Sequence, residues 1–217
     1  MARVKKKNRE NVKKILDIME EIYPDAKCEL NYTTPFELLI ATILSAQCTD
    51  VRVNKVTEKL FKKYNTPEDF AKLTIQQISE EIKSCGLFKS KAQKIKETSV
   101  LLCSKYGSQV PNNMEKLTQL PGVGRKTANV VLSNAFGVDA IAVDTHVFRV
   151  SNRIGLVKTQ TPEKTEFELM KVLPKKRWSK AHHLIIFHGR RICKARKPEC
   201  SICPLKEYCD YYGEGND

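Results

Sequence analysis

A glycine-rich turn placed directly before a helical segment constrains this chain more than any other feature of its sequence. The turn is Pro121-Gly122-Val123-Gly124, and it connects the helical patterns Asn113 to Gln119 and Arg125 to Phe136. Glycine lets the backbone turn tightly with no Cβ in the way, so amide N–H groups can approach an anion closely. These amides would lie at a helix N-terminus, which favours phosphate. The pattern predicts a phosphate-binding hairpin between helices, or else an ordinary capped turn.

Two reactive side chains accompany the turn. Lys126 lies in the first turn of the second helix, and Asp144 follows eighteen residues later. An amine just behind a phosphate anchor can act as a nucleophile as well as a charge, although it could also be merely solvated. A nucleotide-binding P-loop does not fit, because Arg125 rather than a glycine precedes Lys126 and a helical pattern rather than a strand leads into the turn.

Four cysteines in the C-terminal part form a second group: Cys193, Cys200, Cys203 and Cys209, with six, two and five residues between them. Thiols this dense indicate a metal site or disulfides. Structural zinc favours two short Cys-x2–4-Cys pairs, and only one such pair is present. An iron–sulfur cluster tolerates irregular loop spacings. The spacing therefore favours an iron–sulfur cluster and leaves zinc and disulfides open.

Positive charge is concentrated in one segment of this chain of 217 residues, whose formal net charge is +13. Between Pro174 and Lys206 there are ten Lys or Arg and a single acid, Glu199, which leaves a net +9. Such a basic stripe predicts a polyanionic partner. The longest apolar stretch, Leu38 to Ala46, is about half as long as the ~20 residues that a membrane span needs. The N-terminal MARVKKKNRE has no apolar signal-peptide core, so we expect a cytoplasmic protein without membrane segments.

Helix signals recur along the chain. Thr-Pro occurs at 34–35, 66–67 and 161–162, each predicting an N-cap followed by proline in the first helical turn. Glu37 follows Thr34 at the spacing of a capping box, and Asp50 is expected to cap the next helix. The segment Val138 to Val150 is rich in Val and Ile, so propensity alone favours a strand there.

Taken together, these motifs resemble the endonuclease III family of bifunctional DNA glycosylases and abasic-site lyases, within the helix-hairpin-helix superfamily. The matching segments are LPGVGRKTANVV at 120–131, VDTHVFRVSNR at 143–153, LLIATILSAQCTD at 38–50 and the four-cysteine pattern. The resemblance runs from about residue 8 to 212. It implies one [4Fe-4S] cluster held by the four cysteines, and double-stranded DNA with a damaged base or abasic site as partner.

The resemblance also implies the fold, which is all-α with two helical domains flanking a DNA-binding cleft. A six-helix domain would span 28–138 and end in the helix-hairpin-helix at 113–136. Residues 1–27 and 139–217 would form a discontinuous domain with the C-terminal iron–sulfur loop. A helix is expected to start near Asp144, against the strand propensity of that segment.

Roles for individual residues follow from the same resemblance. Lys126 is expected to form a Schiff base with the sugar, and Asp144 to stabilise the cationic transition state or move protons, while also capping a helix. Gln47 would fill the gap left by a flipped base and Leu87 would wedge against its orphaned partner. The alternative is a purely structural role, in which Gln47 is a helix C-cap and Leu87 is an anchor in the core. Further DNA contacts are expected from Gly122, Gly124, Arg125, His146, Lys194, Arg196 and Lys197, although His146 could equally be structural.

The expected activity is removal of oxidised pyrimidines followed by β-elimination at the abasic site, by a monomer. One alternative is the monofunctional adenine mismatch glycosylase, a relative that shares the cysteine pattern but usually lacks a lysine at position 126. The other is a non-catalytic helix-hairpin-helix DNA-binding iron–sulfur protein, which the pairing of Lys126 with Asp144 argues against.

Overall fold

The computed structural model describes residues 7–215, and every regular element within that range is a helix. This confirms the predicted all-α class. The chain divides into two compact units. The central unit is Glu29–Val138, and the composite unit combines the residues up to Cys28 with those from Asp139 onward. None of the helices in residues 7–215 has the length and hydropathy that crossing a bilayer requires.

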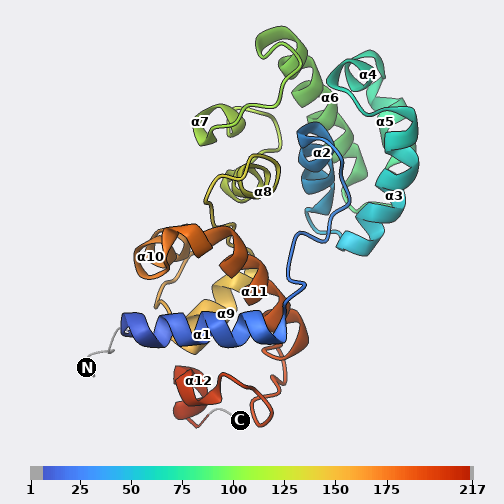
Figure 1. Ribbon diagram of the computed structural model, residues 1–217. Helices are drawn as coiled ribbons and strands as arrows, with labels where there is room; N and C mark the ends of the chain where they lie inside the picture. Colours follow the sequence, from blue (N-terminus) through green and yellow to red (C-terminus); the bar gives the residue numbers. More distant parts are fainter. Residues whose placement is uncertain (1–6, 216–217) are drawn as a thin grey trace. The chain divides into compact units, whose positions relative to one another are not determined.

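The central unit is built around a helix that is apolar on all sides. Its helices are α2 (Pro35–Ser45), α3 (Asp50–Lys63), α4 (Pro67–Lys72), α5 (Ile75–Glu81), α6 (Phe88–Lys105), α7 (Met114–Leu117) and α8 (Arg125–Ala135). Every residue of α2 from Phe36 to Leu44 is buried, as expected for a helix without a polar face. It packs against α3, α6 and α8, while α4 and α5 pack on α6 (Figure 1).

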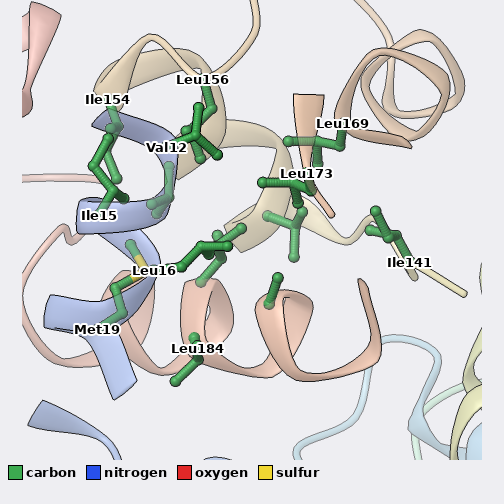
Figure 2. Close-up of a cluster of buried hydrophobic side chains, with 14 of the residues drawn as sticks. Val12, Ile15, Leu16, Met19, Ile141, Ile154, Leu156, Leu169, Leu173 and Leu184 are labelled. Carbon is green, nitrogen blue, oxygen red and sulfur yellow. The ribbon is translucent and has the colours of Figure 1, made fainter. Parts of the chain in front are cut away.

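The composite unit joins the first helix of the chain to its last third. It contains α1 (Arg9–Ile22), α9 (Thr145–Ile154), α10 (Pro162–Val172), α11 (Trp178–Arg191) and α12 (Asp210–Gly213), with 3-10 turns η1 (Lys175–Arg177) and η2 (Lys206–Tyr208). Val12, Ile15 and Met19 recur at helical spacing on α1 and are buried. Figure 2 shows them packed with Ile154, Leu184 and their neighbours in one core.

The threonine caps form where the sequence predicts them. Thr34, Thr66 and Thr161 each accept a hydrogen bond from the backbone amide three residues on. Two details were wrong. Glu37 does not close a capping box with Thr34; its Oε2 accepts from the amide and hydroxyl of Thr33 instead. The residue that caps α3 is Thr49, and Asp50 is the first residue of the helix.

The Val- and Ile-rich segment before Asp144 forms no strand. Ala140 to Val143 are buried in an irregular connection, which explains their apolar character. Helix α9 begins directly after Asp144, whose Oδ1 accepts a hydrogen bond from the amide of Val147 at 2.8 Å. Val147, Val150 and Ile154 are buried at helical spacing. The cap and the helical period together outweigh the strand propensity.

Candidate functional site

The two glycines of the hairpin serve different purposes. Gly122 has a φ of 79°, in the left-handed region, and a Cβ there would lie 3.0 Å from Cδ of Lys94. The turn therefore requires glycine at 122. Gly124 has an ordinary φ of −87° and caps α8 without any side-chain hydrogen bond, and a Cβ there would meet no atom within 4 Å. The space beside Gly124, at the N-terminus of α8, is thus open.

Lys126 lies on a helix that is packed against the core of the central unit. Ala128, Val131 and Leu132 are buried on one face of α8, and this helix packs against α2. Lys126 is exposed and Arg125 is half-exposed. The fold of the central unit therefore presents an amine to solvent in the first turn of the helix that follows the hairpin.

Asp144 and His146 belong to the composite unit, at the start of α9. One carboxylate oxygen of Asp144 caps the helix, so the predicted capping role is present. Nδ1 of His146 lies 3.2 Å from Nη2 of Arg149. Because a guanidinium only donates, Nδ1 is the acceptor. His146 therefore has a structural partner within its own helix.

Gln47 and Leu87 share an unusual backbone conformation in the central unit. Their φ angles are 53° and 57°, in the left-handed region that non-glycine residues seldom adopt and that stores strain. Both side chains are exposed, and that of Leu87 is 59% exposed, so Leu87 is not a core anchor. Gln47 is not the C-cap of α2 either, because that position is Ala46.

The four cysteines at 193–209 line one cavity in the composite unit. None of the four forms a disulfide within residues 7–215, which agrees with a metal site. Among the described residues, no three His, Cys, Asp or Glu side chains are placed to hold a single metal ion. Burial raises the pKa of Cys203 to about 11 and also raises that of Cys209. A thiolate in this cavity therefore needs a cationic partner such as the irons of a cluster, and the donor set fits one.

Hydrogen-bond donors face these thiols. Nη1 of Arg153 donates to Sγ of Cys193 at 3.7 Å, and Nε2 of His188 lies 3.6 Å from Sγ of Cys203. Burial lowers the pKa of His188 to about 4, so the ring is neutral at pH 7. The hydroxyl of Tyr23 lies 3.1 Å from Nδ1 of His188. With Tyr23 donating to Nδ1, the Nε2–H points to Cys203 and complements the negative charge of a ligated cluster.

Two arginines of α9 bind the cysteine loop, residues 193–209, to this helix. Arg149 donates to the carbonyl oxygens of Gly189 and Cys193 at 2.9 and 3.0 Å. Arg153 donates to those of Lys194 and Ala195 at 2.7 and 3.0 Å. Neither arginine was predicted from the sequence to have a role in the site. Their i, i+4 spacing on the helix that Asp144 caps was the available signal.

The basic stripe is partly engaged inside the composite unit. Arg177 forms ion pairs with Asp17 and Glu20, and Lys194 pairs with Glu199. Arg196 and Lys197 are exposed on the cysteine loop. The charge available to a partner is therefore smaller than the sequence count of the stripe suggests, and the cysteine loop retains part of it.

Family models match most of the chain. Residues 40–175 match the HhH-GPD superfamily of base excision DNA repair proteins, and residues 193–209 match the iron–sulfur binding domain of endonuclease III. Endonuclease III of Rickettsia conorii is 54% identical over 201 residues, which are 93% of this chain and 96% of that protein. The chain belongs to the endonuclease III family. Endonuclease III of Escherichia coli K12 is 47% identical over 197 residues, 91% of this chain and 93% of that protein.

A solved member of the family has the same fold. It is described as a trapped covalent intermediate of endonuclease III with DNA, in an estranged-adenine complex, and it matches with a TM-score of 0.92 and 48% identity. The match covers 97% of this chain and 100% of the solved chain. The predicted resemblance is confirmed, and so is the [4Fe-4S] cofactor, because the iron–sulfur domain match begins at Cys193 and ends at Cys209.

Proposed function

We propose that this chain is a base-excision DNA glycosylase and abasic-site lyase, which removes oxidised pyrimidines from double-stranded DNA through a Schiff base at Lys126. One observation carries the proposal: an exposed amine follows a glycine hairpin in the first turn of α8. A family member 48% identical to this chain has been trapped covalently on DNA, and covalent chemistry requires a nucleophile. DNA as the substrate agrees with the cytoplasmic location expected from the sequence, and it would associate the protein with the nucleoid.

The hairpin would anchor the DNA backbone. The N-terminal amides of α8 and the helix dipole favour a phosphate, and the open space at Gly124 admits one. Arg125 adds a positive charge beside the same amides. Anchoring at this point would hold a nucleotide close to Lys126 without reading its base.

Base extrusion would involve Gln47 and Leu87. A glycosidic bond inside a duplex is out of reach, so the damaged nucleotide must leave the stack at a cost of a few kcal/mol. An exposed leucine and an exposed glutamine, each at the tip of a strained turn, are suited to enter the duplex. Leu87 would contact the orphaned base, and Gln47 would occupy the vacated space and offer an amide to its polar edge.

The chemistry would proceed through an imine. The neutral Nζ of Lys126 attacks C1′ of the flipped nucleotide, the glycosidic bond breaks, and the base leaves with the bonding electrons and a proton. Opening of the sugar gives an iminium between Nζ and C1′. The iminium acidifies the C2′–H, so loss of that proton expels the 3′ phosphate by β-elimination. Hydrolysis of the imine then frees Lys126.

Asp144 would assist as a fixed carboxylate. Its Oδ1 caps α9 at 2.8 Å from the amide of Val147, which holds the carboxylate in one orientation on a packed helix. A negative charge fixed in this way can stabilise the cationic sugar in the transition state or carry a proton. The cluster, when bound, supplies folding energy to the loop at 193–209.

Replacing Asp144 with Asn should slow single-turnover base excision by about 10²-fold or more, because a charge acting in the transition state is lost. Asparagine is as good an N-cap as aspartate, so α9 should remain intact. Binding of damaged DNA should be retained. Single-turnover kinetics measure the excision rate, and circular dichroism checks that the helices remain folded. Unchanged kinetics would reduce Asp144 to a helix cap.

The cysteine loop should contribute affinity rather than chemistry. Neutralising Lys194, Arg196 and Lys197 should make the slope of log affinity against log salt shallower by up to about 2.7, at roughly 0.9 per phosphate contact. The pairing of Lys194 with Glu199 places the expected change below that ceiling. Damaged and undamaged duplexes should lose similar affinity, and single-turnover cleavage at saturating enzyme should change little. An unchanged salt slope would show that the loop does not touch DNA.

Incubation of the protein with a duplex containing thymine glycol tests the function as a whole. A bifunctional enzyme should yield nicked strands without alkali, and borohydride present during the reaction should reduce the imine intermediate to a stable covalent protein–DNA adduct. A monofunctional glycosylase would give only alkali-labile sites and no adduct. A DNA-binding protein without activity would leave the strand intact under both conditions.

A further inference from the structure

A buried lysine in the central unit has no role in the site described so far. Lys91, in the second turn of α6, is only 4% exposed. Its Nζ donates to the carbonyl oxygen of Leu44 at 2.8 Å. Lysine is almost never fully buried unless it is paired, and here burial lowers the pKa of the ammonium. A lysine kept at such a position calls for a specific interaction that a hydrophobic residue could not make.

The partner of Lys91 is a carbonyl group in the last turn of α2, a turn that has no basic residue of its own. The last carbonyl groups of a helix lack intrahelical donors and carry its negative dipole end. Helix α2 ends at Ser45 with no basic residue in its last turn. Beyond it the chain turns sharply, with the amide of Cys48 bound to the carbonyl of Ser45 and with Gln47 in the left-handed conformation. The Lys91 ammonium supplies the missing cation from a neighbouring helix.

The same lysine is also linked to the second strained turn. Leu87 is the N-cap of α6, is left-handed, and makes no capping bond with its side chain. Its carbonyl accepts the backbone amide of Lys91 at 3.0 Å. The two turns approach each other closely, since a Cβ on Gly86 would lie 3.3 Å from the carbonyl oxygen of Gln47. Lys91 thus binds Leu87 through its amide and the helix end before Gln47 through its ammonium.

We propose that Lys91 is a positioning residue for base extrusion, holding the turns that carry Gln47 and Leu87 in the arrangement that enters the duplex. This inference rests on the proposed function, within which it names the residue that aligns the inserting pair. Two exposed side chains on separate turns can act together only if the turns keep a fixed spacing. The Lys91 ammonium, fixed between α6 and the end of α2, sets that spacing.

The chain contains a matched control on the same helix. Lys96 of α6 also donates its ammonium to a helix end, the carbonyls of Ala71 and Leu73 at 2.5 and 2.7 Å; Ala71 lies in the last turn of α4 and Leu73 is its C-cap. Lys91→Met and Lys96→Met therefore remove the same kind of capping bond. Only the first change affects the turns of Gln47 and Leu87.

Extrusion can be measured without excision. The probe is a duplex with a non-cleavable tetrahydrofuran abasic site, with 2-aminopurine as the opposing base, whose fluorescence rises when it is unstacked. Lys91→Met should lower the rate of the fluorescence rise about 10-fold, the scale of one hydrogen bond to a charged group. Lys96→Met should lower the melting temperature at least as much, because it removes two such bonds, yet extrude at the wild-type rate. Wild-type extrusion by Lys91→Met, or equal impairment of both variants, would overturn the inference.

Two further variants distinguish a positioning role of Lys91 from a general loss of stability. In a Leu87→Ala background, Lys91→Met should have less than about a third of its usual effect, because residues that act together are not additive. Full additivity would contradict the inference. Lys91→Gln keeps a shorter, neutral hydrogen-bond donor and should give an extrusion rate between those of the wild type and Lys91→Met. It replaces the methionine variant if that variant fails to fold. A wild-type extrusion rate for Lys91→Gln would also contradict the inference. If wild-type protein extrudes but does not cleave thymine glycol duplexes, the proposed function fails while these variants still test Lys91.

Discussion

Lys126→Gln is expected to abolish both borohydride trapping and strand cleavage, while the fold and the affinity for damaged DNA persist. Glutamine is slightly shorter than lysine but keeps a polar side chain at this exposed position, so the packing of α8 against α2 is untouched. It has no amine, so neither the imine nor the elimination that depends on it can occur. The measurement is the yield of covalent adduct and of nicked product on a thymine glycol duplex, alongside a binding titration.

A matched lysine in the same motif serves as the control. Lys116, on α7, is also exposed, and Lys116→Gln should trap and cleave as the wild type does. Trapping by Lys126→Gln at the wild-type yield would assign the nucleophile to a different amine. Loss of DNA binding together with trapping would instead indicate that Lys126 acts mainly as a phosphate contact.

Cys203→Ala should remove the cluster and unfold the loop around it. The wild-type protein should be yellow-brown and contain about four iron and four sulfide per chain. Cys203 packs against the core of the composite unit beside Leu205, which is fully buried, while the rest of the loop has only the short turns η2 and α12. Without one ligand the metal can no longer supply folding energy to this segment. Iron analysis, visible absorbance and proteolysis within 190–212 measure the loss.

The control for this prediction is Cys103→Ala, which removes a half-buried thiol of α6 outside the loop. It should retain colour and iron. If Cys203→Ala also kept a full complement of iron, Cys203 would not be a ligand. Stoichiometric zinc in colourless, active wild-type protein would overturn the cofactor assignment itself.

Local signals in the sequence were reliable where short-range bonds decide the structure. The caps at Thr34, Thr66 and Thr161 depend on an acceptor three residues from its donor, so they can be read from spacing. The start of α9 at Asp144 was predictable for the same reason, once the resemblance had outweighed the propensity of valine and isoleucine. The error at Asp50 shows the limit of this reasoning. Thr49 offers an equally good cap one residue earlier, and one-residue shifts at helix ends are common.

Long-range contacts in the site could not be predicted. Tyr23 and His188 are neighbours at the cysteine loop, although 165 residues separate them in the chain. Lys91 and Leu44 likewise meet only because α6 packs on α2. Nothing in the local pattern around Lys91 distinguishes it from the solvated lysines of the same helix. Its role depends on a packing arrangement that only the tertiary structure provides.

The composite unit has a consequence for the order in which the chain folds during synthesis. Helix α1 leaves the ribosome before the other helices described, but its buried residues belong to one core with residues of α9, α10 and α11 (Figure 2). The central unit is a compact unit of its own. It can therefore fold before the helices that share a core with α1 have been synthesised. The apolar face of α1 therefore stays uncovered through the synthesis of more than one hundred residues. We expect this helix to be the segment of the nascent chain that ribosome-associated chaperones protect for longest.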